Sequence, residues 1–177
     1  MNKSLIQTER LGLRNWTEAD ITAMIAISSD PLVMEYFPAT ATPEQTTSFS
    51  KRMQEMCDLR KYCYFAVEEL ATQEMIGFIG LCYQDYEARF TPCVDIGWRL
   101  KPSAWGKGYA TEGAKACLDY ARETLALTEI YSVAVKINTP SIKVMEKIGM
   151  DYVETFVHPK LKDNERLRDC VLYRKVF

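Results

Sequence analysis

Apolar and polar residues alternate along several stretches of the chain, and this alternation predicts β-strands. In the first stretch, Leu11 and Leu13 alternate with Arg10 and Arg14, which is the period of a strand with one buried face. A polar segment, Glu69–Glu74, separates the second and third stretches and is typical of a hairpin turn. The predicted strands cover Leu5–Trp16, Tyr62–Glu68, Met75–Tyr83, Cys93–Leu100, Ile130–Val135, Tyr152–Val157 and Leu167–Val176.

Capping residues predict two helices between the first and second strands. Thr17-Glu18-Ala19-Asp20 resembles a capping box, in which a hydroxyl cap is followed by a carboxylate three residues later. Thr42 and Pro43 supply the cap and the first-turn proline of a second helix, which is predicted to end near Cys57.

Two further helices alternate with the later strands. Residues 108–125 form a predicted helix whose stripe of small residues lets it lie close on a sheet. Thr139-Pro140 opens a short helix that Gly149 stops. The order β-α-α-β-β-β-α-β-α-β-β predicts an α+β fold with a mixed sheet covered by helices. Since nothing in the sequence resembles a linker, residues 1–177 are predicted to form one domain.

Composition and charge narrow the function classes. The 177 residues carry a net charge of −2, so no overall basic field is available to hold nucleic acid. No apolar run approaches the length of a membrane span, and the first residues lack the apolar core of a signal peptide. We expect neither nucleic acid nor a membrane as a partner.

The six cysteines and the single histidine argue against a metal site. No two cysteines form a C-x-x-C pair, and a Cys/His zinc site of standard spacing is absent. Most of the cysteines lie in apolar segments, where a reduced thiol behaves as a small hydrophobe. The sequence therefore predicts buried thiols, no metal and a cytoplasmic location.

The loop between the fourth strand and the third helix combines two glycines with a lysine. Gly106 and Gly108 permit positive φ and close ligand approach, and the helix start beyond them offers free N–H groups that favour an anion. With the charge of Lys107, the loop is predicted to cradle a phosphate group. The dinucleotide-binding pattern G-x-G-x-x-G does not match, because Thr111 stands where its third glycine belongs. The Walker A motif does not match either, because Lys107 is followed by Gly108 and not by Ser or Thr. An ordinary loop with a glycine cap is the alternative.

Around this loop the sequence resembles motif A of the GNAT superfamily of N-acetyltransferases. Gly108 and Ala110 match the pattern Gln/Arg-x-x-Gly-x-Gly/Ala, whereas Trp105 stands where Gln or Arg is usual. The Trp-Gly-x-Gly-Tyr-Ala form is similar to the RimJ/RimL-like branch, as are the segments Thr8–Arg14 and Asn138-x-x-Ser141. The resemblance implies a three-layer fold in which about four helices flank a mostly antiparallel sheet of about seven strands, splayed between strands four and five.

The same resemblance implies the activity and the cofactor contacts. An acetyl group would pass from acetyl-CoA to a primary amine by direct attack in a ternary complex. Pantetheine would pair with the fourth strand, the diphosphate would sit on Gly106–Ala110, and Asn138 and Ser141 would face the pantetheine and the thiol. A plain helix-entry role for Asn138 is the alternative. The implied cofactor-binding residues are Trp98, Arg99, Leu100, Trp105, Gly106, Lys107, Gly108, Tyr109, Ala110, Thr111, Asn138 and Ser141.

Asp95 is the candidate general base, because a carboxylate in an otherwise apolar strand needs a reason. Gly97 suggests a bulge that would aim Asp95 at the thioester. The alternative is that Asp95 points outward or forms an ion pair with Arg99. His158, the only histidine, is expected in solvent at a hairpin tip and is a poor candidate for the base.

The group that protonates the leaving thiolate is less evident. Many GNAT enzymes have a tyrosine seven residues after the asparagine of the short helix, and here that position holds Met145. Ser141 is the nearest replacement and the second candidate catalytic residue. A non-catalytic acyl-CoA-binding or regulatory module with the same fold is therefore the alternative function.

The acceptor amine is expected to bind near Asp30–Thr42 and Gln84–Thr91. The carboxylates Glu35, Asp85 and Glu87 either attract a cationic amine or form a solvated face. The sequence does not choose between a small molecule and a protein N-terminus, and it is compatible with a monomer or a homodimer.

Overall fold

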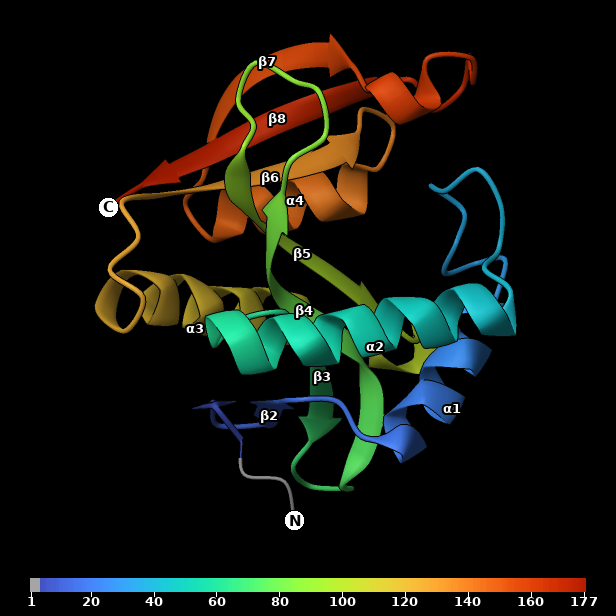
Figure 1. Ribbon diagram of the computed structural model, residues 1–177, viewed down its shortest axis with the longest axis vertical. Helices are drawn as coiled ribbons and strands as arrows, with labels where there is room; N and C mark the ends of the chain where they lie inside the picture. Colours follow the sequence, from blue (N-terminus) through green and yellow to red (C-terminus); the bar gives the residue numbers. More distant parts are fainter. Residues whose placement is uncertain (1–3) are drawn as a thin grey trace.

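The computed structural model describes residues 4–177, and its centre is one eight-stranded sheet (Figure 1). The strand order is β1-β2-β3-β4-β5-β6-β8-β7, and every neighbouring pair is antiparallel except β5 and β6. The predicted mixed, mostly antiparallel sheet is thereby confirmed. The strands are β1 (Ile6–Gln7), β2 (Leu11–Arg14), β3 (Tyr64–Glu69), β4 (Glu74–Gln84), β5 (Cys93–Leu100), β6 (Glu129–Val135), β7 (Asp151–Val157) and β8 (Asp169–Val176).

Four α-helices form where the capping residues predict them. Thr17 and Asp20 make the capping box of the first helix, and Thr42 caps the second with Pro43 in its first turn. The second helix runs to Arg60, one turn beyond the predicted end. The helices are α1 (Glu18–Ser28), α2 (Pro43–Arg60), α3 (Tyr109–Glu123) and α4 (Thr139–Lys147), with short 3-10 helices at Pro102–Ala104 and Pro159–Leu161.

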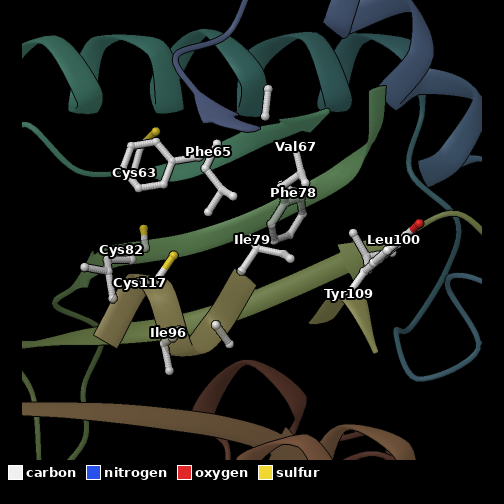
Figure 2. Packing of buried hydrophobic residues seen from close by; sticks show 14 of the residues in the cluster. Cys63, Phe65, Val67, Phe78, Ile79, Cys82, Ile96, Leu100, Tyr109 and Cys117 are labelled. Carbon is white, nitrogen blue, oxygen red and sulfur yellow. The ribbon is translucent and has the colours of Figure 1, made fainter. Parts of the chain in front are cut away.

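The helices form layers on opposite faces of the sheet. Adjacent residues of a strand point to opposite faces, so β4 separates the layers. Phe78 packs against Phe49 of α2 with ring centroids 5.3 Å apart. Ile79 faces α3, where a Cβ on Gly113 would lie 2.6 Å from Ile79 Cδ1. Figure 2 shows Ile79 in the core together with Cys117 of α3. The small residues of α3 therefore permit the close approach that the sequence predicts.

The first predicted strand is wrong as a single element. Residues 5–16 contain two strands, β1 and β2, which pair as a hairpin with Ile6 opposite Leu13. The Thr8 N–H bonds the Leu11 carbonyl at 2.9 Å and closes the turn between them. Both arms have the same alternation, so the pattern does not reveal the reversal, and the sheet has eight strands instead of about seven.

The predicted bulge at Gly97 is also wrong. The register between β4 and β5 continues without a shift from Gln84–Cys93 to Gly77–Leu100. Register shifts occur instead in the β3–β4 ladder, between Val67 and Glu68, and in the β7–β8 ladder, between Tyr152 and Glu154.

The predicted splay lies between β5 and β6. The two strands pair in register only at Asp95 and Tyr131, whereas β4 and β5 pair along the full length of β5. A gap therefore opens in the sheet toward the C-terminal ends of both strands. Within residues 4–177, no helix is long and apolar enough to cross a membrane.

Candidate active site

The gap between β5 and β6 exposes backbone polar groups of β5. The Ile96 carbonyl accepts a hydrogen bond from Ser132 Oγ at 3.0 Å, and the Leu100 carbonyl accepts one from Trp105 Nε1 at 2.8 Å. Residues two apart in a strand direct their backbone groups to the same edge. Trp98, which lies between these two residues, therefore directs its N–H and C=O into the gap.

The glycine-rich loop begins where β5 ends. Gly106 and Gly108 have φ values of 71° and 80°, in the region that favours glycine. Gly108 is the N-cap of α3, and the first helical bond joins the Glu112 N–H to its carbonyl at 3.0 Å. The N–H groups at positions 109–111 precede this bond and stay outside the helical ladder. A Cβ on Gly106 would meet no protein atom within 4 Å, so the space beside the loop is open.

The turn between β1 and β2 braces this loop. Arg10 Nη1 donates to the Lys107 carbonyl at 3.0 Å, and Arg10 Nε donates to Glu112 Oε2 at 2.7 Å. Thr8 Oγ1 donates to Glu112 Oε1 at 2.6 Å. The segments Thr8–Arg14 and Trp105–Glu112, both noted for their resemblance, thus meet in one network. Their contact was not predicted, because no spacing along the chain relates residues this far apart.

The other predicted residues of the loop differ in their surroundings. Trp105 is 48% exposed although its indole N–H is bonded, and Lys107 is exposed with Nζ 5.7 Å from the Tyr109 ring centroid. The Tyr109 hydroxyl donates to Glu69 and ties α3 to β3. Ala110 and Thr111 are half-buried in the first turn of α3. Lys107 is therefore the cation of the loop that reaches solvent.

The start of α4 lies at the same end of the sheet as this loop, because β5 and β6 run parallel. Asn138 Oδ1 accepts the Ser141 N–H at 3.1 Å, so the helix-entry role accounts for this oxygen. Ser141 Oγ makes no hydrogen bond within residues 4–177. Met145 is 1% exposed and belongs to the hydrophobic core.

Asp95 is held by two hydrogen-bond donors, one on β3 and one on β4. The Tyr64 hydroxyl donates to Asp95 Oδ1 at 2.6 Å, and Gln84 Nε2 donates to Asp95 Oδ2 at 3.1 Å. Burial raises the pKa of Asp95 to about 7, and the two hydrogen bonds oppose a larger rise. The residue as a whole is half-buried. Asp95 can therefore exchange a proton near neutral pH with a group that enters the site.

Aromatic packing positions Tyr64. Its ring stacks on Phe78 with centroids 5.0 Å apart, and its carbonyl accepts Trp16 Nε1 at 2.7 Å. Gly97 leaves room for the ring, since a Cβ there would lie 3.2 Å from Tyr64 Cε1. Sequence reasoning did not predict that Tyr64 and Gln84 bond Asp95, although Gln84 begins one of the segments expected near the acceptor. The strand register would have shown that Tyr64 lies near Asp95. Tyr64 pairs with Gly80, and Gly80 pairs with Gly97, which is two residues from Asp95.

Arg99 does not pair with Asp95. Its Nη1 donates to Ser28 Oγ at 3.2 Å, and its Cζ lies 4.4 Å from the Phe37 ring centroid and 5.3 Å from that of Phe78. The alternative of an ion pair between Arg99 and Asp95 is therefore wrong.

His158 is not the solvated residue that the sequence predicts. It is half-buried, with its ring centroid 4.7 Å from that of Tyr86, and Nδ1 accepts the Lys160 N–H at 3.2 Å. Burial lowers the pKa of His158, and the charge of Lys160 lowers it further. No hydrogen bond joins His158 to Asp95 in the part of the chain that the structure describes.

The segments expected near the acceptor contribute aromatic rings. Phe37 lies over Arg99, and the Tyr86 ring packs at a tilt against His158. Burial raises the pKa of Tyr86, and the charge of Asp95 adds to this rise. By contrast, the predicted carboxylates Glu35, Asp85 and Glu87 are all exposed. Asp95, in contrast, is near enough to Tyr86 for its charge to act on the Tyr86 hydroxyl.

Two cavities lie away from Asp95. One of about 260 Å³ is lined by α3 and the end of β8, and one of about 190 Å³ lies between the 85–92 segment and β7. Neither is lined by Asp95, Tyr64 or the glycine-rich loop.

Comparison with known proteins assigns the family. A family model of the acetyltransferase (GNAT) domain matches residues 10–151. The chain belongs to the GNAT acetyltransferase family. It is 32% identical over 172 residues to the N-acetyltransferase p20 of Bacillus licheniformis, covering 95% of this chain and 93% of the relative.

Solved GNAT structures agree with the fold. A GNAT-family acetyltransferase from Bacillus anthracis superposes with a TM-score of 0.80 at 30% identity, covering 97% of each chain. Spermidine N-acetyltransferase from Vibrio cholerae, solved with CoA and spermine, has a TM-score of 0.74 at 19% identity over 96% of each chain. The second likeness concerns the fold alone. The eight-stranded sheet and four helices are therefore the mixed α/β GNAT fold.

Proposed function

We propose that this protein transfers an acetyl group from acetyl-CoA to a primary amine, with Asp95 as the general base. The observation that carries this proposal is the half-buried Asp95, with its pKa near 7, on the strand that borders the splay. GNAT relatives named as N-acetyltransferases support the reaction class. The resemblance to the RimJ/RimL-like branch and a cytoplasmic location remain parts of this proposal, the latter supported by six free cysteines.

The residues at the splay fit an acyl-CoA. Trp98 offers an unpaired backbone edge that suits the amide groups of pantetheine. The free N–H groups at the start of α3, with open space beside Gly106 and the exposed Lys107, suit a diphosphate. Acetyl-CoA supplies an activated acyl group as a thioester. At least one solved GNAT neighbour binds CoA, which supports the same donor here.

Proton transfer explains why the base is needed. An alkylamine with a pKa of about 10.4 is mostly protonated at pH 7, and only its neutral form attacks a carbonyl. The Asp95 carboxylate takes this proton directly or through one water, the new C–N bond forms, and the C–S bond breaks. A backbone N–H of β5 near Trp98 is the donor proposed for the oxyanion.

The leaving thiolate takes a proton from water directly, or from the Ser141 hydroxyl, which a water molecule reprotonates. Ser141 Oγ is free to donate, and Met145 is buried in the core where it offers no proton. A thiol with a pKa of about 8.5, judged from free cysteine, also leaves readily as a thiolate at neutral pH. The absence of a tyrosine at position 145 is therefore compatible with turnover.

Acetyl-CoA is expected to raise the melting temperature, whereas NAD and ATP are not. A ligand at 100 times its Kd adds about 2.7 kcal/mol to the free energy of unfolding. Thiol release measured against a panel of primary amines then tests catalysis. Binding without thiol release for any amine would favour the non-catalytic acyl-CoA-binding module, and no response to acetyl-CoA would contradict both functions.

Tyr64→Phe is expected to shift the acid limb of the kcat/KM profile to higher pH. The Tyr64 hydroxyl stabilises the ionised Asp95 carboxylate, so its removal raises the pKa of the base. Activity needs ionised Asp95. As the pH is lowered, the variant should therefore lose activity at a higher pH than the wild type does. Phe49→Leu, which changes the same aromatic cluster without touching the carboxylate, is the control. An unchanged acid limb in Tyr64→Phe would mean that the Tyr64 hydroxyl does not affect the pKa of the base.

A further inference from the structure

Arg99 is a mostly buried cation without an anionic partner. No carboxylate within residues 4–177 forms an ion pair with it, and Ser28 Oγ is the one hydrogen-bond acceptor found for its guanidinium. Its Nε is buried and has no hydrogen-bond partner among the residues that the structure describes. Burial lowers the pKa of Arg99 to about 10, so the group is still charged at neutral pH.

This arrangement is costly unless something else compensates the charge. A buried ion is destabilising when its hydrogen bonds and its charge are not matched. The rings of Phe37 and Phe78 offer cation–π contacts, which compensate only part of the cost of removing the guanidinium from water. Arg14 illustrates the usual solution, because it pairs with both Asp20 and Glu68.

Arg99 lies on the acceptor side of the sheet. It shares a face of β5 with Asp95, and this face carries α1 and α2 through the contacts of Ser28 and Phe78. The α3 helix, whose start is the proposed diphosphate seat, covers the opposite face. The charge of Arg99 therefore has no CoA phosphate beside it in the proposed complex.

We propose that the acceptor is an amino-acid-type compound, in which Arg99 binds a carboxylate while the amine reaches Asp95. The proposal rests on the proposed acetyl transfer and names its acceptor class. A guanidinium is planar and binds a carboxylate through two parallel hydrogen bonds. Arg99 fits this role because Ser28 Oγ takes only one of its hydrogen bonds. Phe37, 41% exposed and in contact with the guanidinium, forms the wall past which the carboxylate enters.

The spacing along β5 favours an extended acceptor. Asp95 and Arg99 are four residues apart, about 13 Å between Cα atoms at about 3.3 Å per residue. Their side chains bridge part of this distance, and the amine and the carboxylate span the remainder. An ω-amino acid with several carbons between the two groups is therefore expected to be a better acceptor than glycine.

The test compares acceptors that differ only in the anionic group. Straight-chain ω-amino acids with two to six carbons are assayed beside their primary amides, and the readout is the ratio of kcat/KM for acid over amide. In the longer pairs of acid and amide, the pKa of the amine is nearly the same. The ratio of kcat/KM therefore measures the effect of the carboxylate alone. Wild-type protein is expected to favour the acid at least about tenfold, a preference typical of one charge-assisted hydrogen-bonded pair.

Arg99→Met is expected to bring this ratio close to one, and Arg99→Lys to an intermediate value, since lysine keeps the charge without the planar fork. Arg60→Met is the matched control, because Arg60 also lies over an aromatic ring, Tyr83, but at the exposed end of α2. It should leave the ratio unchanged.

Three outcomes would overturn the proposal. The first is that the wild type acetylates amides or polyamines as well as it acetylates the acids. The second is that Arg99→Met keeps the wild-type ratio of kcat/KM for acid over amide. The third is that Arg99→Met raises the KM for acetyl-CoA without changing this ratio, which would assign Arg99 to the binding of the acyl donor. In each of these cases amines are still acetylated, so the proposed function stands. No acetylation of any amine by the wild type would instead contradict the proposed function itself, and with it this proposal.

Discussion

Asp95→Asn is expected to lower kcat for acetyl transfer by about 10²–10⁴-fold, which is the usual contribution of a positioned general base. Asparagine keeps the size of the side chain and an oxygen that can accept from Tyr64, but it cannot take a proton. Binding of acetyl-CoA is expected to stay close to that of the wild type, because the proposed donor contacts are backbone groups elsewhere. Thiol release at saturating acetyl-CoA measures the first effect, and calorimetric titration measures the second.

The pH dependence gives the prediction a second readout. The wild-type kcat/KM should rise with pH through the Asp95 pKa of about 7 and then level off, whereas Asp95→Asn should lose this limb. An unchanged turnover in the variant would show that another group removes the proton. A wild-type limb at pH 4, the ordinary range of an aspartate, would show that Asp95 titrates as if exposed to solvent.

Stability provides the control for folding. Burial raises the pKa of Asp95 in the folded state, so the stability that this group contributes is complete below its unfolded pKa and is lost as the pH rises through about 7. Above pH 7 the fold therefore holds an unfavourable buried charge that asparagine removes. We expect Asp95→Asn to melt no lower than the wild type at pH 8, and a clear drop would mean that lost activity reflects unfolding.

Local signals predicted the elements correctly where a residue acts on its immediate neighbours. The capping boxes at Thr17 and Thr42 satisfy helix-end N–H groups a few residues away, so their meaning is complete within one turn. The same holds for Gly106 and Gly108, whose positive φ values were expected from the loop itself. The reversal between β1 and β2 was missed, because both strands carry the same alternation of apolar and polar residues.

The site required contacts between distant segments. Asp95 was identified because a carboxylate is unusual in an apolar strand, but its partners Tyr64 and Gln84 become visible only through the strand register. The ion pair considered for Arg99 failed for the opposite reason, since residues four apart in a strand share a face without touching. Period and composition indicate which face a side chain takes, whereas tertiary packing decides what it meets there.

Gly106→Ala is expected to weaken acetyl-CoA binding at least about tenfold, or about 1.4 kcal/mol. The φ of 71° puts an alanine in the left-handed region, at a cost of about 1–2 kcal/mol, and its methyl group would occupy the open space beside the loop. Gly108→Ala should act in the same direction, because its φ is 80° at the N-cap of α3. Calorimetric titration with acetyl-CoA gives the Kd of each variant.

Gly149→Ala is the matched control for backbone strain. Gly149 has a φ of 75°, and the nearest atom to an added Cβ is the flexible Nζ of Lys175 at 3.3 Å. It follows α4, at the opposite end of that helix from Asn138, so the variant should lose stability while it keeps the wild-type Kd. If Gly106→Ala and Gly149→Ala weakened acetyl-CoA binding equally, the effect would come from backbone strain alone. Unchanged binding in both loop variants would mean that the diphosphate binds elsewhere. A methyl group between the diphosphate and the backbone N–H groups that bind it would weaken those hydrogen bonds.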